Sequence, residues 1–335
     1  MNDMLSGGLG LGMIIERFLQ SEELRKYRVF KADLKAWVWQ RRHLWKRLRD
    51  DGSLKRLSDR EFAPVFICGI AGSGTTLITA LLDQSYENSL CLRESARLPE
   101  TDRLLWLNKT YEYHDLDQYR DALNFPKGIS VARVRRAVLS TYRRLVEYPR
   151  ANSVVIDKAP NAHMVRIGKL SEAFPNAKVV MIYRDPLDVI EGLIRKWPQP
   201  FAMASLDALC AFYNEIHWEF IEQSQQIENR LILELDTLKA NSEAITREIA
   251  AWLGLEERKE IKVYRDRNNT VGKGLRNVVD GKVYVDTKTA SRVNERFSAQ
   301  EQKLIRDLTQ EMYKTLQSLE SLSINTKNEC IPQHA

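Results

Sequence analysis

Short apolar runs alternate with helix-like segments along the middle of the chain. The runs that have the composition of buried parallel strands are residues 65–68, 154–156, 179–183 and 231–235. Between them, apolar residues recur every three or four positions, which indicates amphipathic helices. Strands that alternate with helices predict a parallel sheet with helices on both faces, a three-layer α/β/α fold. The glycine-rich segment 69–76 after the first strand makes this a fold of the P-loop type.

The last helix is marked by a capping sequence. Ser298 and Glu301 have the spacing of a capping box, in which side chain and backbone satisfy each other's hydrogen bonds at a helix start. The apolar spacing after it predicts a buried stripe made of Leu304, Leu308, Met312 and Leu316.

The pattern divides the chain into a basic helical N-terminal extension, residues 1–60, an α/β domain, residues 61–322, and a disordered tail, residues 323–335. Residues 100–150 read as a helical insertion that covers a site. Its basic and aromatic residues either face an acidic glycan or form a solvated helix face; they are Arg133, Arg135, Arg136, Tyr142 and Arg143.

The N-terminal extension is rich in Lys and Arg over residues 25–56, interleaved with Trp37, Trp39 and Trp45. One interpretation is peripheral contact with acidic lipid or another anionic partner. The other is a solvated helix that docks its tryptophans on the main domain.

Composition is that of an ordinary globular chain: 335 residues, 44% hydrophobic and 29% charged. A net charge of +6 suits an anionic ligand but is too small to indicate nucleic acid. The four cysteines are widely spaced and form no zinc-type cluster, so no metal is expected. Residues 9–15 are too short and glycine-broken for a signal peptide, and we expect a cytoplasmic protein.

Residues 69–76 have the GxxxxG spacing of a phosphate-binding loop, with Thr75 where a nucleotide hydrolase has Lys. A glycine turn into a helix start offers backbone N–H groups and a positive dipole end to phosphate or sulfate. Because Lys is missing, the loop argues against an ordinary NTPase. The alternative is a tight turn that binds no ligand.

These residues resemble the sulfotransferase family, whose members transfer a sulfuryl group from 3′-phosphoadenosine-5′-phosphosulfate (PAPS). Residues 73–77, SGTTL, resemble the family's 5′-phosphosulfate loop, and residues 179–188, VVMIYRDPLD, its 3′-phosphate motif. Residues 157–160, DKAP, are similar to the bacterial branch. The resemblance covers about residues 65–274.

The resemblance implies the residues that bind the cofactor. The 5′-phosphosulfate is assigned to the loop residues Gly72, Ser73, Gly74, Thr75 and Thr76. Arg184 is expected to pair with the 3′-phosphate, because a planar guanidinium gives directional bidentate contacts. Gly192 stands where relatives place a Ser on that phosphate. Lys273 belongs to a segment, VGKG, that resembles the one closing over the cofactor.

Transfer to a hydroxyl needs a base and cations near the leaving oxygens. Glu94 is the predicted base, because its surroundings resemble the segment around the catalytic Glu of protein-tyrosine sulfotransferases. Arg93 and Arg97 flank it and would hold the carboxylate or share the charge. Lys158 is expected beside the sulfuryl group, and the alternative is an ion pair with Asp157.

Two histidines and two glycines complicate this assignment. His114 and His163 are rival bases, since histidine serves in cytosolic relatives. Gly72 replaces the Lys or Arg that usually precedes the loop Ser, so Lys158, Arg93, Arg97 or Lys273 must supply that charge, or the protein is slow or inactive. At Gly192 a hydroxyl is lost.

The sequence thus predicts a PAPS-dependent sulfotransferase that acts on a hydroxyl by in-line displacement, releases PAP (adenosine 3′,5′-bisphosphate) and needs neither metal nor nucleic acid. The acceptor is open among carbohydrate, lipid, tyrosine and small molecules, and the oligomeric state is not predicted. One alternative is a non-catalytic PAP-binding protein, and a weaker one is a P-loop kinase. A membrane or nucleic-acid module built on residues 25–56 leaves the α/β core unexplained.

Overall fold

The chain of the computed structural model divides after Leu54 into two units, and the described residues belong to the second, Lys55–Ala335. The structure describes residues 62–97, 101–107, 112–145, 153–197, 199–258, 278–279, 282–283 and 292–320. The predicted extension 1–60, the tail 323–335 and Lys273 lie outside these ranges.

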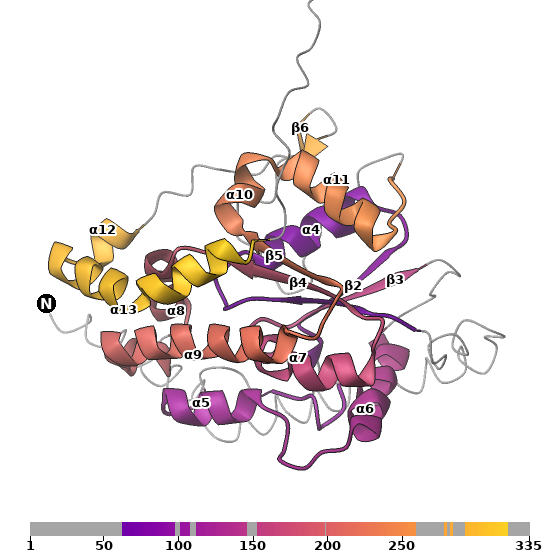
Figure 1. Cartoon of the computed structure of the whole chain (residues 1–335), viewed down its shortest axis with the longest axis horizontal. Coiled ribbons are helices and arrows are strands. Elements are labelled where there is room, and N and C mark those ends of the chain that lie inside the picture. Colours follow the sequence, from indigo (N-terminus) through magenta and orange to yellow (C-terminus); the bar gives the residue numbers. More distant parts are fainter. Residues whose placement is uncertain are drawn as a thin grey trace, which may run out of the picture. The chain divides into compact units, whose positions relative to one another are not determined.

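The centre of the second unit is a five-stranded parallel sheet (Figure 1). Its strands are β1 Val65–Cys68, β2 Ser89–Arg93, β3 Val154–Lys158, β4 Lys178–Tyr183 and β5 Arg230–Glu234. They lie in the order β2-β3-β1-β4-β5, and every pairing is parallel. The order reverses around β1, and in open α/β sheets ligands bind at the carboxyl ends of the strands where it does so.

The edge strand β2 was not predicted from the sequence. Its apolar run, Leu90-Cys91-Leu92, is short and contains none of the β-branched residues that favour strands. Among the described strands, β2 pairs only with β3. Buried Ser89 satisfies its hydroxyl by donating to the carbonyls of Leu82 and Tyr86, at 3.1 and 3.0 Å.

Helices cover both faces of the sheet, which confirms the predicted three-layer architecture (Figure 1). One layer contains α4 Thr75–Ser85, α10 Leu235–Ala240 and α11 Ser242–Leu253, which share an apolar core with the strands. The other contains α7 Ala162–Ala173 and α9 Leu206–Ser224, with α5 Leu116–Leu123 and α6 Val131–Leu145 packed against α7. Helix α8 Pro186–Lys196 follows β4 and contacts α9.

The C-terminal elements are the short pair β6 Val278–Val279 and β7 Lys282–Val283, then α12 Val293–Arg296 and α13 Ala299–Ser318. The predicted capping box of Ser298 and Glu301 is present.

The predicted buried stripe of α13 is confirmed at Met312 and Leu316 but is wrong by one position in the first half of the helix. Leu304 and Leu308 are 38% and 42% exposed, and the buried row is Ile305, Thr309, Met312 and Leu316. The apolar pattern did not predict this row because the row contains a polar residue, Thr309. Thr309 can be buried there because its hydroxyl donates to the Ile305 carbonyl.

The segment predicted as a helical insertion is helical in α5 and α6, and it is fastened to the α/β core. The buried guanidinium of Arg166 on α7 donates to the carbonyls of Leu105, Ala122 and Leu123. Arg135 donates to the Ala173 carbonyl at 2.6 Å and lies over the Phe174 ring. Arg135 therefore makes a packing contact, whereas Arg136 and Arg143 are exposed.

None of the helices that the structure describes is both long and apolar enough to cross a membrane.

Candidate functional site

The phosphate loop connects β1 to α4, and two of its glycines are required by positive φ angles together with close neighbours. Gly69 has φ of 150°, and a Cβ there would lie 2.2 Å from the Ile182 carbonyl oxygen. Gly74 has φ of 100°, and a Cβ would lie 2.3 Å from a methyl group of Leu235. The first turn of α4 leaves amides without intrahelical acceptors, so the loop ends in donors that suit an anion.

Ser73 and the Ala71 amide make hydrogen bonds within the protein, so these loop groups are already satisfied. The Ser73 side chain is fully buried, and its hydroxyl and its amide both point to the Ile70 carbonyl. The Ala71 amide donates to the side chain of Asn161 at 2.8 Å. Ser73 therefore shapes the loop through its side chain, and Thr75 and Thr76 open α4 next to it.

Lys158 and Glu94 meet at the carboxyl ends of β3 and β2. Lys158 Nζ lies 3.3 Å from Glu94 Oε1 and 3.1 Å from Thr76 Oγ1, so it touches the phosphate loop and the predicted base at once. Its side chain is only 4% exposed, whereas that of Glu94 is 44% exposed. Glu94 has φ of 43°, a left-handed conformation that is costly outside glycine and is frequent at functional sites.

Asp157 is not the partner of Lys158, which removes the alternative ion pair. Consecutive strand residues point to opposite faces, and Asp157 instead accepts from Ser95 at 2.7 Å and from Tyr142 at 2.9 Å. The second rival base, His163, packs behind Asp157: its Nε2 lies 3.6 Å from the carboxylate, and its ring stacks edge-on against Phe66.

The other rival base, His114, lies elsewhere. It is exposed in the loop before α5 and lines a small cavity of about 230 Å³ together with Asp115, Pro200 and Met203. No predicted phosphate-binding residue lines that cavity. The structure thus brings Glu94, and neither histidine, to the phosphate loop.

Arg184 follows β4, the neighbour of β1 on the side away from β3. Its carbonyl accepts from the Tyr213 hydroxyl at 3.1 Å, and its Nη2 pairs with Asp188 at 3.0 Å. Its Nε is buried and has no hydrogen-bond partner among the described residues. A buried donor without an acceptor is costly, so this guanidinium fits an anion that would complete its hydrogen bonds.

Lys196, at the end of α8, is a cation that sequence reasoning missed. Lys196 is an exposed residue, but partial burial of its ammonium group lowers its pKa, and the charges of Arg195, Arg184 and Lys158 lower it further. Its spacing of four from Gly192 could have revealed it, because residues i and i+4 share a helix face.

Both predicted departures from the family pattern leave space beside α8. A Cβ built at Gly192 meets no atom within 4 Å, and one at Gly72 meets only the Val189 carbonyl, at 3.9 Å. Gly72 therefore faces α8 about one turn before Gly192. The two glycines open a space between the loop and a helix that carries Lys196.

A comparison with models of protein families shows to which family the chain belongs. Residues 64–259, more than half of the chain, match the model of the sulfotransferase family. The chain belongs to the sulfotransferase family. This confirms the predicted family, and no curated protein matches the sequence of this sulfotransferase.

Solved sulfotransferase structures resemble the chain at low identity. The enzyme from Alicyclobacillus acidocaldarius is 13% identical, with a TM-score of 0.46, over 78% of this chain and 98% of that one. STF9 from Mycobacterium avium is 15% identical, with a TM-score of 0.48, over 81% of each chain. Mouse SULT7A1, solved with PAP, is 13% identical, with a TM-score of 0.45, over 80% of this chain and 92% of that one.

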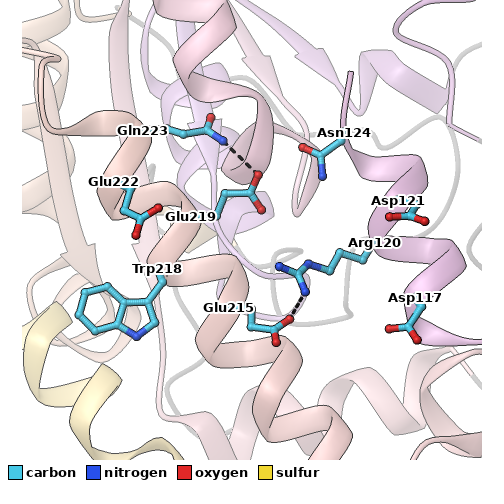
Figure 2. A pocket seen from close by; sticks show the side chains of 9 residues that line it. All are labelled: Asp117, Arg120, Asp121, Asn124, Glu215, Trp218, Glu219, Glu222 and Gln223. Atoms are coloured by element: carbon cyan, nitrogen blue, oxygen red, sulfur yellow. Dashed lines mark hydrogen bonds and ion pairs between the residues drawn. The ribbon is translucent and has the colours of Figure 1, made fainter. Parts of the chain in front are cut away.

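A larger cavity of the sulfotransferase, about 670 Å³, lies between α5 and α9 (Figure 2). Its lining is Asp117, Arg120, Asp121, Asn124, Glu215, Trp218, Glu219, Glu222 and Gln223. Arg120 pairs with Glu215, and burial raises the pKa of Glu219. Carboxylates outnumber the single cation, so this cavity repels an anionic nucleotide, and none of the predicted site residues lines it.

The remaining predicted site residues fall outside the description. Lys273 is not among the described residues, and neither are the side chains of Arg93 and Arg97. Within the part of the chain that is described, no group of three or more His, Cys, Asp or Glu side chains could hold a metal ion.

Proposed function

We propose that this sulfotransferase moves the sulfuryl group of PAPS to a hydroxyl of an acceptor. The observation that carries the proposal is the position of Lys158, whose ammonium group joins the phosphate loop at Thr76 to the carboxylate of Glu94. One cation thus lies where a bound anion and a proton acceptor come together.

The described residues fit the two anionic ends of PAPS, which would supply the sulfuryl group. The amides at the start of α4, with Gly72, Gly74, Thr75 and Thr76, are assigned to the 5′-phosphosulfate. The Nε of Arg184, which has no hydrogen-bond partner within the described ranges, is assigned to the 3′-phosphate. Lys196 adds positive charge on the α8 face that Gly192 leaves open.

Glu94 acts as the base in this proposal. Its carboxylate takes the proton of the acceptor hydroxyl while that oxygen forms the new bond to sulfur and the bond from sulfur to the 5′-phosphate oxygen breaks. Lys158 stabilises the charge that gathers on the departing oxygens, and its contact with Glu94 holds the carboxylate beside the loop. Because Gly72 offers no side chain, Lys158 supplies the charge that relatives place before the loop Ser, while Lys273, Arg93 and Arg97 remain sequence-based candidates.

Several finer points remain parts of the proposal. They are the domain limits 1–60, 61–322 and 323–335, a cytoplasmic location, peripheral membrane contact through residues 25–56, and an acceptor drawn from carbohydrates, lipids, tyrosine or small molecules. The acidic cavity adds a restriction, since it offers no surface for an acidic glycan between α5 and α9.

Turnover of sulfur-labelled PAPS with an acceptor panel tests the proposal, using Glu94→Gln beside wild type. We expect Glu94→Gln to lose about 10²–10⁴-fold in transfer rate while PAP affinity, measured by calorimetry, stays within about twofold. Glu243→Gln is the matched control, because Glu243 is exposed and pairs with Arg247 on the surface. A Glu94→Gln protein that transfers sulfate at the wild-type rate would exclude Glu94 as the base.

A non-catalytic PAP-binding protein is the second candidate, favoured by the two missing side chains at Gly72 and Gly192. It predicts PAP binding without turnover of any acceptor. A kinase is the weaker alternative, and tighter binding of ATP than of PAPS would favour it.

A further inference from the structure

Two buried tyrosines from the helical insertion form hydrogen bonds with Asp157, directly before Lys158, and with Asn161, three residues after it. Tyr142 of α6 donates its hydroxyl to Asp157 at 2.9 Å, and Tyr119 of α5 accepts from the side-chain amide of Asn161 at 2.8 Å. All four side chains are 2% exposed or less. Polar groups buried this deeply need partners, so each tyrosine hydroxyl and its partner fix each other's orientation.

The Tyr119 contact continues into the phosphate loop. The side-chain oxygen of Asn161 accepts from the Ala71 backbone amide at 2.8 Å. The backbone amide of Asn161 donates to the Gly69 carbonyl at 3.1 Å. Its backbone has φ of 60°, which is strained for a non-glycine residue. The amide plane of Asn161, set by Tyr119, therefore holds the first half of the loop in shape.

The Tyr142 contact continues to the predicted base. The other carboxylate oxygen of Asp157 accepts from Ser95 at 2.7 Å, and Ser95 directly follows Glu94. Glu94 is in its left-handed conformation and donates its amide to the Lys158 carbonyl at 2.8 Å. Asp157 thus fixes the turn at residues 94–95, in which Glu94 contacts Lys158.

We propose that α5 and α6 set the geometry of the site through these two tyrosine hydroxyls, with Asn161 as the positioning residue of the phosphate loop and Asp157 as that of Glu94. The inference rests on the proposed function for its catalytic consequence. Displacing a reacting group by about 1 Å can cost 10²-fold in rate, so a hydroxyl remote from the sulfuryl group matters if it fixes Glu94.

Phenylalanine substitutions test this, because they remove the hydroxyl and keep the ring. We expect Tyr119→Phe to weaken PAP binding about fivefold, the value of one net hydrogen bond, with little change in turnover at saturating PAPS. Tyr142→Phe is expected to lower that turnover tenfold to about 10²-fold and to leave PAP affinity within about twofold. The matched control is Tyr86→Phe, since Tyr86 is buried at the far end of α4, about 16 Å along the helix from the loop.

Amide hydrogen exchange without ligand separates this inference from the proposed function. Of the two variants, only Tyr119→Phe should speed amide exchange in residues 69–76. Only Tyr142→Phe should speed it in residues 94–97. Local acceleration without PAP binding or turnover in wild type would keep the positioning role and reject the proposed function. Wild-type turnover with both variants indistinguishable from Tyr86→Phe would overturn the inference. Should Tyr142→Phe fail to fold, Ser95→Ala breaks the same connection from its other end, and wild-type turnover in that variant would overturn it equally.

Discussion

Glu94 and Lys158 are bonded to each other twice, through their side chains at 3.3 Å and through the Glu94 amide and Lys158 carbonyl at 2.8 Å. The backbone bond joins the residue directly after β2 to Lys158, the last residue of β3. It fixes the carboxylate and the ammonium group at the same edge of the sheet as the phosphate loop. A pair held in this way is preorganised, which is what electrostatic catalysis requires.

Replacing Lys158 by Met should remove the cation while keeping most of the buried volume. We expect sulfuryl transfer to fall about 10²–10³-fold, the usual effect of losing one preorganised charge or donor. PAP affinity should fall much less, because the loop amides and Arg184 remain. Steady-state transfer from labelled PAPS measures the rate. Lys169→Met is the control, since the Lys169 side chain is 43% exposed on α7 and pairs with Glu172. A Lys158→Met rate equal to that of the control would remove Lys158 from the mechanism.

Arg184 should determine the preference for a 3′-phosphate. Arg184→Met is expected to weaken PAP binding tenfold to about 10²-fold, because hydrogen bonds to charged groups contribute about 1.5–3 kcal/mol. Binding of AMP, which has no 3′-phosphate, should barely change. Calorimetry with both nucleotides gives the ratio, and Arg247→Met on the exposed face of α11 is the control. If the variant lost affinity for AMP and PAP equally, Arg184 would not read the 3′-phosphate.

Gly192 offers a gain-of-affinity experiment, because a side chain there meets open space. Gly192→Ala and Gly192→Ser should both stabilise α8, by up to about 1 kcal/mol for Ala and less for Ser, since glycine is unfavourable within a helix. Only the Ser variant carries a hydroxyl, and we expect it to bind PAP about fivefold more tightly. Equal PAP affinities for the Ala and Ser variants would show that position 192 does not face the phosphate.

His217 should make the fold sensitive to acid. Burial lowers its pKa from 6.5 to about 4, and its Nε2 is buried with no partner among the described residues. Between these values the unfolded chain binds a proton that the folded protein excludes, so stability is fully present above about pH 6.5 and falls as the pH drops towards 4. The loss is about 3 kcal/mol.

Chemical denaturation at several pH values measures this loss. His217→Gln should flatten the pH dependence between 6.5 and 4, whereas His114→Gln, at an exposed position, should leave it unchanged. An unaltered slope in His217→Gln would assign the acid sensitivity to other groups.

The sequence by itself determined the features that depend on local spacing. The loop at 69–76, the central strands, the capping box at Ser298 and the Arg184 motif each lie within one short stretch, where periodicity, glycine and proline positions carry the information. Those stretches were enough to predict the fold class and the family.

The tertiary structure decided which distant residues meet. Strand β2 became visible only through its partner β3, and the buried row of α13 only through the surface against which the helix packs. The pairing of Lys158 with Glu94 rather than Asp157, and the tyrosine contacts of Asp157 and Asn161, join residues up to 64 positions apart. Side-chain partners at such separations follow from strand order and helix packing, which no local pattern in the chain encodes.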